Sequence, residues 1–280
     1  MIMKIILIRS RAIDQAVCKI ALSLSNSGHD VTLLVWDRQN DLISDPNIPY
    51  KVDAFKLRAP YDKFIALLYL PFWWIHEFIF LIRHDFDVVH ACDLDTIFPA
   101  IFLKKIIGFK LCYIIYDFSA NNLPDGKLQN LRKLFKGLVA SIENYCIGFS
   151  DILFLVDESR LGEVNISKIK KVVYLYNSPN DYQKFNSRIE RNDGNILVFY
   201  AGIILGSRGL EYMIKAVNDL ENFKLILAGK ISDEKIIRTA NLYLDKIHYI
   251  GWLPTYPDVI SKTIEADILF RFSDPKLSKT

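Results

Sequence analysis

This sequence has few cysteines, lacks the common glycine-rich motifs and carries little net charge. Its 280 residues include four cysteines, Cys18, Cys92, Cys112 and Cys146, which lie far apart and form no CxxC pair. That spacing does not suit a zinc site and is typical of buried thiols in a reducing compartment. The 35 basic against 32 acidic residues leave a net charge of +3, which is too balanced for a dedicated nucleic-acid-binding protein.

Several nucleotide-binding and catalytic motifs are also missing. The turn after the first apolar run reads Arg9-Ser10-Arg11-Ala12 and lacks the glycines of a dinucleotide-binding GxGxxG turn. The sequence has no Walker A motif and no GxSxG elbow, and His76-Glu77 lacks the second histidine of a metalloprotease helix. Met1 leads directly into an apolar strand without the features of a signal peptide, so we expect a cytoplasmic protein.

The apolar residues that are present occur in short, continuous runs. These runs cover residues 5–8, 31–36, 87–91, 111–116, 151–156, 172–176, 196–201, 223–228, 246–250 and 267–272. Continuous runs are typical of parallel strands covered on both faces. Helical segments such as residues 12–27 and 96–107 lie between them, so the sequence predicts an α/β fold built from βαβ units.

A polar stretch divides this pattern in two. At about 150 residues per domain, the chain is long enough for about two domains. We expect an N-terminal domain over residues 1–180, a linker over 181–195 and a second domain over 196–280.

Residues 64–82 form the longest apolar segment, and His76 and Glu77 are its only strongly polar members. Pro71 and this polar pair argue against a helix that crosses a bilayer, which needs about 20 apolar residues. Two alternatives remain: a buried helix of the first domain, or an interfacial helix whose Trp73 and Trp74 lie at the headgroup level.

Residues 127–137 predict a basic amphipathic helix. The segment contains Lys127, Arg132, Lys133 and Lys136 and no acid. Such a helix can lie on anionic lipid, which makes Arg132, Lys133 and Lys136 candidates for a membrane interface. The alternative is an ordinary solvated helix face.

The pair Asp93-Leu94-Asp95 follows an apolar strand and opens a helix. Two carboxylates at this spacing could hold Mg²⁺ or Mn²⁺. Acids at this position also cap helix N-termini, and this is the interpretation we favour. We therefore expect no metal site.

The second domain carries a sharper pattern. Gly202 ends a strand, and Arg208 and Gly209 stand where the next helix begins. Glycine lets a phosphate approach the backbone, free N–H groups at a helix N-terminus bind anions, and an arginine can donate a forked hydrogen bond. The pattern predicts a phosphate-binding site. The alternative is that Arg208 is an ordinary surface arginine beside a plain turn.

Several short segments, in this order, resemble the GT-B glycosyltransferases of retaining family 4. They are residues 28–32 (GHDVT), 90–96 (HACDLDT), 116–119 (YDFS), 177–180 (NSPN), 202–209, 227–230 (LAGK) and 249–252 (YIGW). The resemblance implies two Rossmann-like parallel-sheet domains facing a cleft, the second of them incomplete here. It implies a nucleotide-diphosphate sugar as donor, transfer with retention, and a glycan or lipid-linked acceptor. No cofactor, metal or nucleic acid is implied, and a lipid-linked acceptor would bring a cytoplasmic enzyme to the inner face of a membrane as a peripheral protein.

The resemblance also assigns roles to individual residues. The expected donor-binding residues are Gly202, Arg208, Gly209, Gly229, Lys230 and Gly251. The expected catalytic residues, on the sugar and acceptor side, are His90, Asp93 and Asp117, with a satisfied core histidine as the alternative for His90.

The sequence departs from the family pattern at several points. Ser10 and Arg11 replace the glycine-rich acceptor loop, Ile203 replaces a donor-loop arginine, and Ser119 stands where a histidine is common. Family members continue past residue 280 with two glutamates that contact the donor sugar, so we expect the 280-residue chain alone to be nearly inactive. Two alternatives to a working transferase stay open: a truncated or split non-catalytic chain, and a GT-B sugar-nucleotide epimerase.

Overall fold

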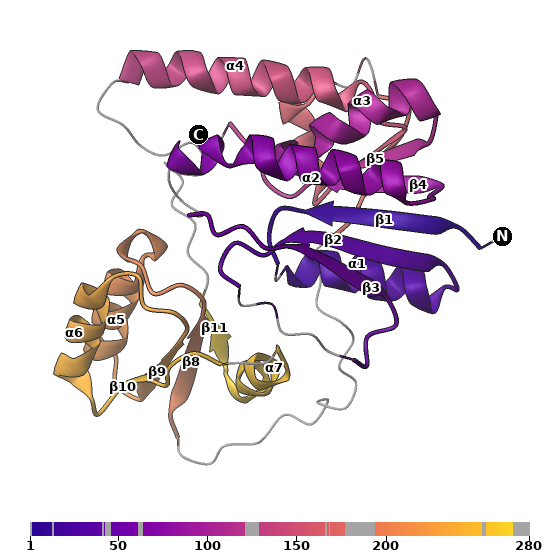
Figure 1. Ribbon diagram of the computed structural model, residues 1–280. Helices are drawn as coiled ribbons and strands as arrows, with labels where there is room; N and C mark the ends of the chain where they lie inside the picture. Colours follow the sequence, from indigo (N-terminus) through magenta and orange to yellow (C-terminus); the bar gives the residue numbers. More distant parts are fainter. Residues whose placement is uncertain are drawn as a thin grey trace. The chain divides into compact units, whose positions relative to one another are not determined.

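The computed structural model describes residues 2–12, 14–40, 42, 46–60, 64–120, 129–165, 167, 169–176, 194–253 and 256–270. The chain divides into two compact units, residues 1–178 and 179–280 (Figure 1). Nearly all of the expected linker, residues 181–195, lies outside the described residues; only Gly194 and Asn195 are described.

The first unit is built on a sheet of seven parallel strands in the order β3-β2-β1-β4-β5-β6-β7. The strands are β1 (Lys4–Arg9), β2 (Asp30–Trp36), β3 (Lys51–Phe55), β4 (Val88–Cys92), β5 (Lys110–Ile115), β6 (Ile152–Leu155) and β7 (Val172–Tyr174). The helices are α1 (Gln15–Asn26), α2 (Leu70–Arg83), α3 (Ile97–Ile107) and α4 (Gln129–Ile147), with 3-10 turns η1 (Phe64–Leu68), η2 (Leu94–Thr96) and η3 (Glu158–Glu163).

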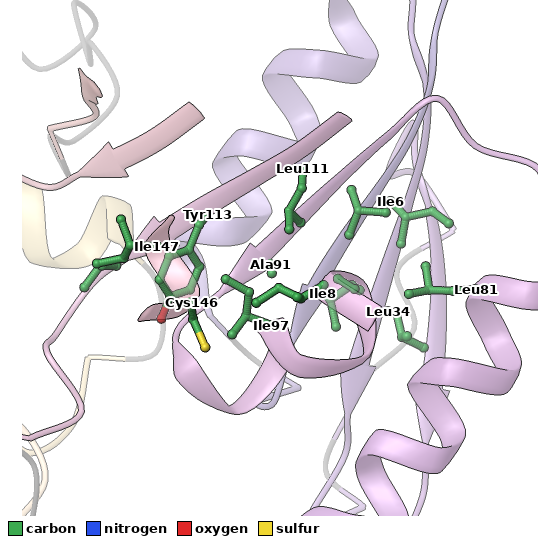
Figure 2. Close-up of a cluster of buried hydrophobic side chains, with 14 of the residues drawn as sticks. Ile6, Ile8, Leu34, Leu81, Ala91, Ile97, Leu111, Tyr113, Cys146 and Ile147 are labelled. Carbon is green, nitrogen blue, oxygen red and sulfur yellow. The ribbon is translucent and has the colours of Figure 1, made fainter. Parts of the chain in front are cut away.

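Helices cover both faces of this sheet. The step from β1 to β2 runs opposite to the steps from β3 to β4, β4 to β5 and β5 to β6, so right-handed crossovers place α1 on one face and α2, α3 and α4 on the other. Alternate residues of β1 follow this division: Ile5 and Leu7 pack with α1, whereas Ile6 and Ile8 pack with α2, α3 and α4. Figure 2 shows the core between this sheet and helices α2, α3 and α4, where Leu81, Ile97 and other buried side chains meet.

The second unit repeats the design on a smaller scale. Its four parallel strands stand in the order β10-β9-β8-β11: β8 (Ile196–Ala201), β9 (Phe223–Ala228), β10 (Ile247–Tyr249) and β11 (Ile268–Leu269). The helices are α5 (Leu210–Asp219), α6 (Glu234–Ala240) and α7 (Tyr256–Glu265), with 3-10 turns η6 (Gly206–Arg208) and η7 (Asn241–Tyr243). Both units therefore have the βαβ construction that the apolar runs predict.

One strand was not expected from the sequence. Strand β3 lies at the edge of the large sheet and its first three residues are exposed. Edge strands pair on one side only and need no continuous apolar run, so the pattern that identifies central strands does not reveal them.

The structure contradicts the alternative in which Trp73 and Trp74 lie at the headgroup level of a bilayer. The Trp73 side chain is fully buried and stacks on Trp36, with ring centroids 5.7 Å apart. Trp74 is half-buried, and its indole Nε1 donates to the Asp95 carbonyl oxygen at 2.9 Å. Both indoles lie on the inner side of α2, because that side packs against the sheet and its neighbouring helix.

The expected basic helix is longer than predicted, since α4 continues past Gly137 to Ile147. Lys133 is exposed and Lys136 is half-exposed, whereas the Arg132 side chain lies outside the described part of the structure. No helix among the described residues combines the length and the apolar character needed to cross a bilayer.

We expect Trp73→Ala to lower the free energy of unfolding of the first unit by about 3–5 kcal/mol, because it removes a fully buried indole and leaves a cavity. Urea denaturation followed by circular dichroism measures this change. The matched control is Trp252→Ala, whose indole is 67% exposed and whose loss should change stability by less than about 0.5 kcal/mol. Equal effects of the two substitutions would contradict the burial of Trp73.

Candidate functional site

A buried arginine organises the carboxyl edge of the large sheet. Arg9, the last residue of β1, is 5% exposed, and its Nε donates to Asp14 Oδ2 at 2.7 Å while its Nη1 donates to Asp93 Oδ2. The guanidinium also lies 5.0 Å from the ring centroid of Tyr116. Burial alone would lower the pKa of Arg9, but Asp93 and Asp14 outweigh it and raise the pKa, so the group stays charged.

Asp93 occupies a strained position directly after β4. Its φ is +66°, a left-handed conformation that is uncommon outside glycine and costs on the order of 1–3 kcal/mol. Besides the ion pair with Arg9, its Oδ1 accepts a hydrogen bond from the Tyr116 N–H at 2.9 Å. Burial raises the pKa of Asp93, and the Arg9 charge opposes this shift.

Asp95 has partners of its own in the same network. It accepts a hydrogen bond from Ser10 Oγ and lies 3.7 Å from Arg38 Nη2. Neither Asp93 nor Thr96 caps a helix with its side chain. The expectation that the acids of this segment serve as helix caps is therefore wrong, because Arg9 and the Tyr116 N–H bind the Asp93 carboxylate and Ser10 Oγ binds that of Asp95.

His90 lies deeper than Asp93. It is the third residue of β4, is 8% exposed and stacks on Phe154 of β6 with ring centroids 5.7 Å apart. Burial lowers the pKa of His90 to about 4, so the imidazole is neutral at physiological pH. Its Nδ1 has no hydrogen-bond partner among the described residues.

The third expected catalytic residue, Asp117, is exposed and pairs with Arg160 Nη2 at 3.2 Å. Within the part of the chain that the structure describes, no hydrogen bond or ion pair joins His90, Asp93 and Asp117 to one another. Asp93 and Asp117 nevertheless follow neighbouring strands, β4 and β5, at the same edge.

Sequence reasoning missed Glu143, a buried carboxyl group of α4 near this edge. It accepts hydrogen bonds from Tyr113 Oη at 3.2 Å, from the Ser119 N–H at 3.1 Å and from Ser119 Oγ at 3.2 Å. Burial raises the pKa of Glu143 to about 7, although these hydrogen bonds oppose the shift. The helix predicted from the sequence ends at residue 137, so Glu143 lay outside it and the sequence offered no signal for this carboxyl group.

Glu77 of α2 was noted in the sequence only as an interruption of an apolar segment. The structure buries it completely, and both carboxyl oxygens lack a hydrogen-bond partner among the described residues. Burial, with the nearby charge of Asp95, raises the pKa of Glu77 well above its usual range. Burial therefore favours the neutral form of this carboxyl group.

In the second unit, three glycines meet where neighbouring strands end. Gly202, Gly229 and Gly251 lie in the loops that follow β8, β9 and β10. The Gly202 N–H donates to the Ala228 carbonyl at 2.9 Å, and the Gly229 N–H donates to the Gly251 carbonyl at 2.8 Å. A Cβ on Gly229 would lie 1.7 Å from the Gly202 carbonyl oxygen, so only glycine allows this approach.

The remaining expected donor residues surround these loops. Gly209 directly precedes α5 with a φ of +68°, and this cap residue offers no side-chain acceptor to the first N–H groups of the helix. Arg208 directly precedes Gly209, and Lys230 directly follows Gly229; both are exposed. Neither forms an ion pair with any residue of 194–253 or 256–270. The second unit thus combines a close-packed glycine surface with two available cations, a suitable arrangement for an anion.

A metal-binding cluster is not among these arrangements. Among the described residues, no group of three or more His, Cys, Asp or Glu side chains is placed to hold a metal ion.

We expect Gly229→Ala to lower the free energy of unfolding of the second unit by about 1–3 kcal/mol, because the new methyl group overlaps the Gly202 carbonyl. The control is Gly137→Ala in α4, where a Cβ meets nothing within 4 Å and alanine should stabilise the helix by about 0.5–1 kcal/mol. Urea denaturation measures both. A Gly229→Ala protein as stable as the wild type would refute the close contact of the two loops.

The raised pKa of Glu143 predicts a pH dependence of stability. Its stabilising contribution is fully present below its ordinary pKa near 4.5 and is lost as the pH rises through about 7, because the folded chain disfavours the ionised form. We expect the free energy of unfolding of the wild type, relative to Glu143→Gln, to fall across this window. Urea titrations at several pH values test this, with Glu221→Gln, an exposed substitution, as the control. Parallel pH profiles for the wild type and Glu143→Gln would contradict it.

Comparison with known proteins identifies the fold. No protein-family model and no curated protein matches the sequence. Solved structures do match. A sucrose-phosphate synthase from Thermosynechococcus elongatus has a TM-score of 0.73 at 13% identity over 95% of this chain and 74% of its own. The lipopolysaccharide outer core galactosyltransferase WaaB, in its apo form, has a TM-score of 0.64 at 14% identity, covering 97% of this chain and 74% of its own.

Anabaena HepE, whose structure contains UDP and glucose, has a TM-score of 0.62 at 11% identity, covering 97% of this chain and 74% of its own. Identities this low establish a common fold and no more. The α/β fold of the GT-B type, with two Rossmann-like parallel-sheet units, is confirmed for this chain.

Proposed function

We propose that this chain is a glycosyltransferase that uses a nucleotide-diphosphate sugar as its donor. The observation that carries the proposal is the edge of the second unit, where the loops after three parallel strands interlock through Gly202, Gly229 and Gly251 beside a helix N-terminus without a side-chain cap. Ligands of open parallel sheets bind at the carboxyl ends of the strands, and helix N-termini favour phosphate. The GT-B fold, which is that of sugar transferases such as WaaB, supports the same function.

The proposed donor site uses the residues expected from the sequence. Gly202 and Gly209 let the diphosphate approach the backbone, and Arg208 neutralises its charge. Gly229, Lys230 and Gly251 contact the nucleotide.

In the proposed reaction, the bond between the anomeric carbon and the diphosphate oxygen breaks. A new bond forms from that carbon to an acceptor hydroxyl oxygen, whose proton passes to the departing diphosphate. The N-terminus of α5 and Arg208 stabilise the negative charge on the departing diphosphate without a metal ion. By the resemblance to family 4, we assign retention of the anomeric configuration to this transfer.

The acceptor, a glycan or lipid-linked glycan, is assigned to the first unit. Asp93 and Asp117 lie at the carboxyl edge of the large sheet and are the proposed catalytic carboxylates. Arg9 holds Asp93 in place. His90 is buried and neutral below this edge, so we assign it to positioning the end of β4.

Arg208→Ala should weaken binding of a nucleotide diphosphate by about tenfold or more, equivalent to about 1.4 kcal/mol, because it removes a charge-assisted hydrogen bond to phosphate. Isothermal titration calorimetry with UDP, ADP and GDP measures the change. The control is Lys215→Ala, which removes an exposed cation from α5. Unchanged affinity in Arg208→Ala would refute the donor site, and product analysis with a panel of sugar nucleotides and glycan acceptors tests the transfer itself.

A further inference from the structure

The outer side of α2 exposes a continuous stripe of large apolar side chains. Phe72, Ile75, Ile79 and Ile82 are 58%, 58%, 42% and 55% exposed, and their spacing of three and four residues places them along one face of the helix. The opposite face carries the buried Trp73, Glu77 and Leu81. Helix α2 is therefore apolar on both sides, and only one of them packs against the sheet.

Helix α3 extends this stripe sideways. It packs beside α2, with the rings of Phe78 and Phe102 5.7 Å apart, and Figure 1 shows the two helices next to each other. Phe102 and Ile106 of α3 are 57% and 67% exposed. Together with the four side chains of the α2 stripe they form what we call the α2–α3 apolar patch. Large exposed apolar patches mark surfaces that contact a partner or a membrane.

The exposed charges that the structure describes on α2, α3 and α4 have one sign, although Asp53 Oδ1 of β3 lies 3.9 Å from His76 Nε2 of α2. The only acids of α2, α3 and α4 are Glu77 and Glu143, and both are fully buried. The exposed charged side chains that the structure describes on these three helices are Arg83, Lys105 and Lys133, and Lys136 is half-exposed. The first acid beyond α2, Asp85, forms an ion pair with Lys4.

Helix α4 belongs to the same layer and repeats the combination. Leu134 and Leu138, four residues apart, are 70% and 54% exposed, and Lys133 and Lys136 stand between and beside them. Large apolar groups flanked by lysine and arginine are the composition of helices that lie in the headgroup region of a bilayer.

We infer that the α2–α3 apolar patch, with the basic residues of α2, α3 and α4, docks this protein on a bilayer that contains anionic lipid. Charge complementarity selects this occupant. Anionic headgroups attract the lysines and arginines, whereas a second copy of the chain would bring two basic faces together. The inference concerns different residues from Trp73 and Trp74 and does not depend on the proposed donor site.

Vesicle flotation of the full chain tests the inference. The wild type should float with vesicles of equimolar phosphatidylglycerol and phosphatidylcholine and much less with pure phosphatidylcholine, and raising the salt concentration should weaken the binding. Ile75→Gln/Ile79→Gln should lower the partition coefficient by about tenfold or more. The matched control, Leu242→Gln/Leu244→Gln, replaces two exposed leucines of the second unit, 74% and 62% exposed, and should float like the wild type.

Two further variants test the inference independently of the Ile75→Gln/Ile79→Gln substitution. Phe102→Gln, on the neighbouring helix, should weaken flotation by itself, and Lys133→Gln/Lys136→Gln should reduce its salt dependence relative to Lys215→Gln. Circular dichroism verifies that each variant is folded. Three results would overturn the inference: no flotation of the wild type, equal flotation of folded Ile75→Gln/Ile79→Gln, or a wild-type dimer that this double substitution dissociates while vesicles remain unbound. Flotation does not depend on nucleotide binding. If the proposed donor site is wrong, the outcome of the flotation test is therefore unaffected.

Discussion

Parallel pairing of the strands organises both units of this protein. Every strand pair that the structure describes is parallel. Parallel neighbours require crossover connections, which supply the helices that cover each sheet, and they bring the carboxyl ends of all strands to one edge. Residues far apart in the sequence, such as Arg9 and Asp93, meet because they follow strands of the same direction.

The two edges that result differ in chemistry. At the edge of the large sheet, buried arginines and carboxylates neutralise one another, and Asp93 is kept in a left-handed conformation by partners on two sides. At the edge of the small sheet, backbone groups contact each other directly, and Arg208 and Lys230 remain exposed. The first arrangement is suited to orienting a group rigidly, and the second to receiving an anionic ligand.

Helix α2 shows how one apolar segment can serve two purposes. The inner face completes the core around Trp36 and Trp73, which stabilises the first unit. The outer face, with Phe72 and Ile79, adds nothing to that core and stays exposed. Since burial of either face is equally favourable per unit area, hydrophobicity alone does not decide which residues face inward.

From the sequence alone we could predict the α/β class, the central strands and the glycine-containing loops that follow β8, β9 and β10. These features depend on local patterns: continuous apolar runs define covered parallel strands, and glycines mark the turns after β8, β9 and β10. Only the tertiary structure revealed the edge strand β3, the ion pairs of Arg9, the buried carboxyl of Glu143 and the inward direction of Trp73. Each of these depends on which distant segment lies beside the residue, and that is decided by strand order and helix packing, which no short stretch of sequence encodes.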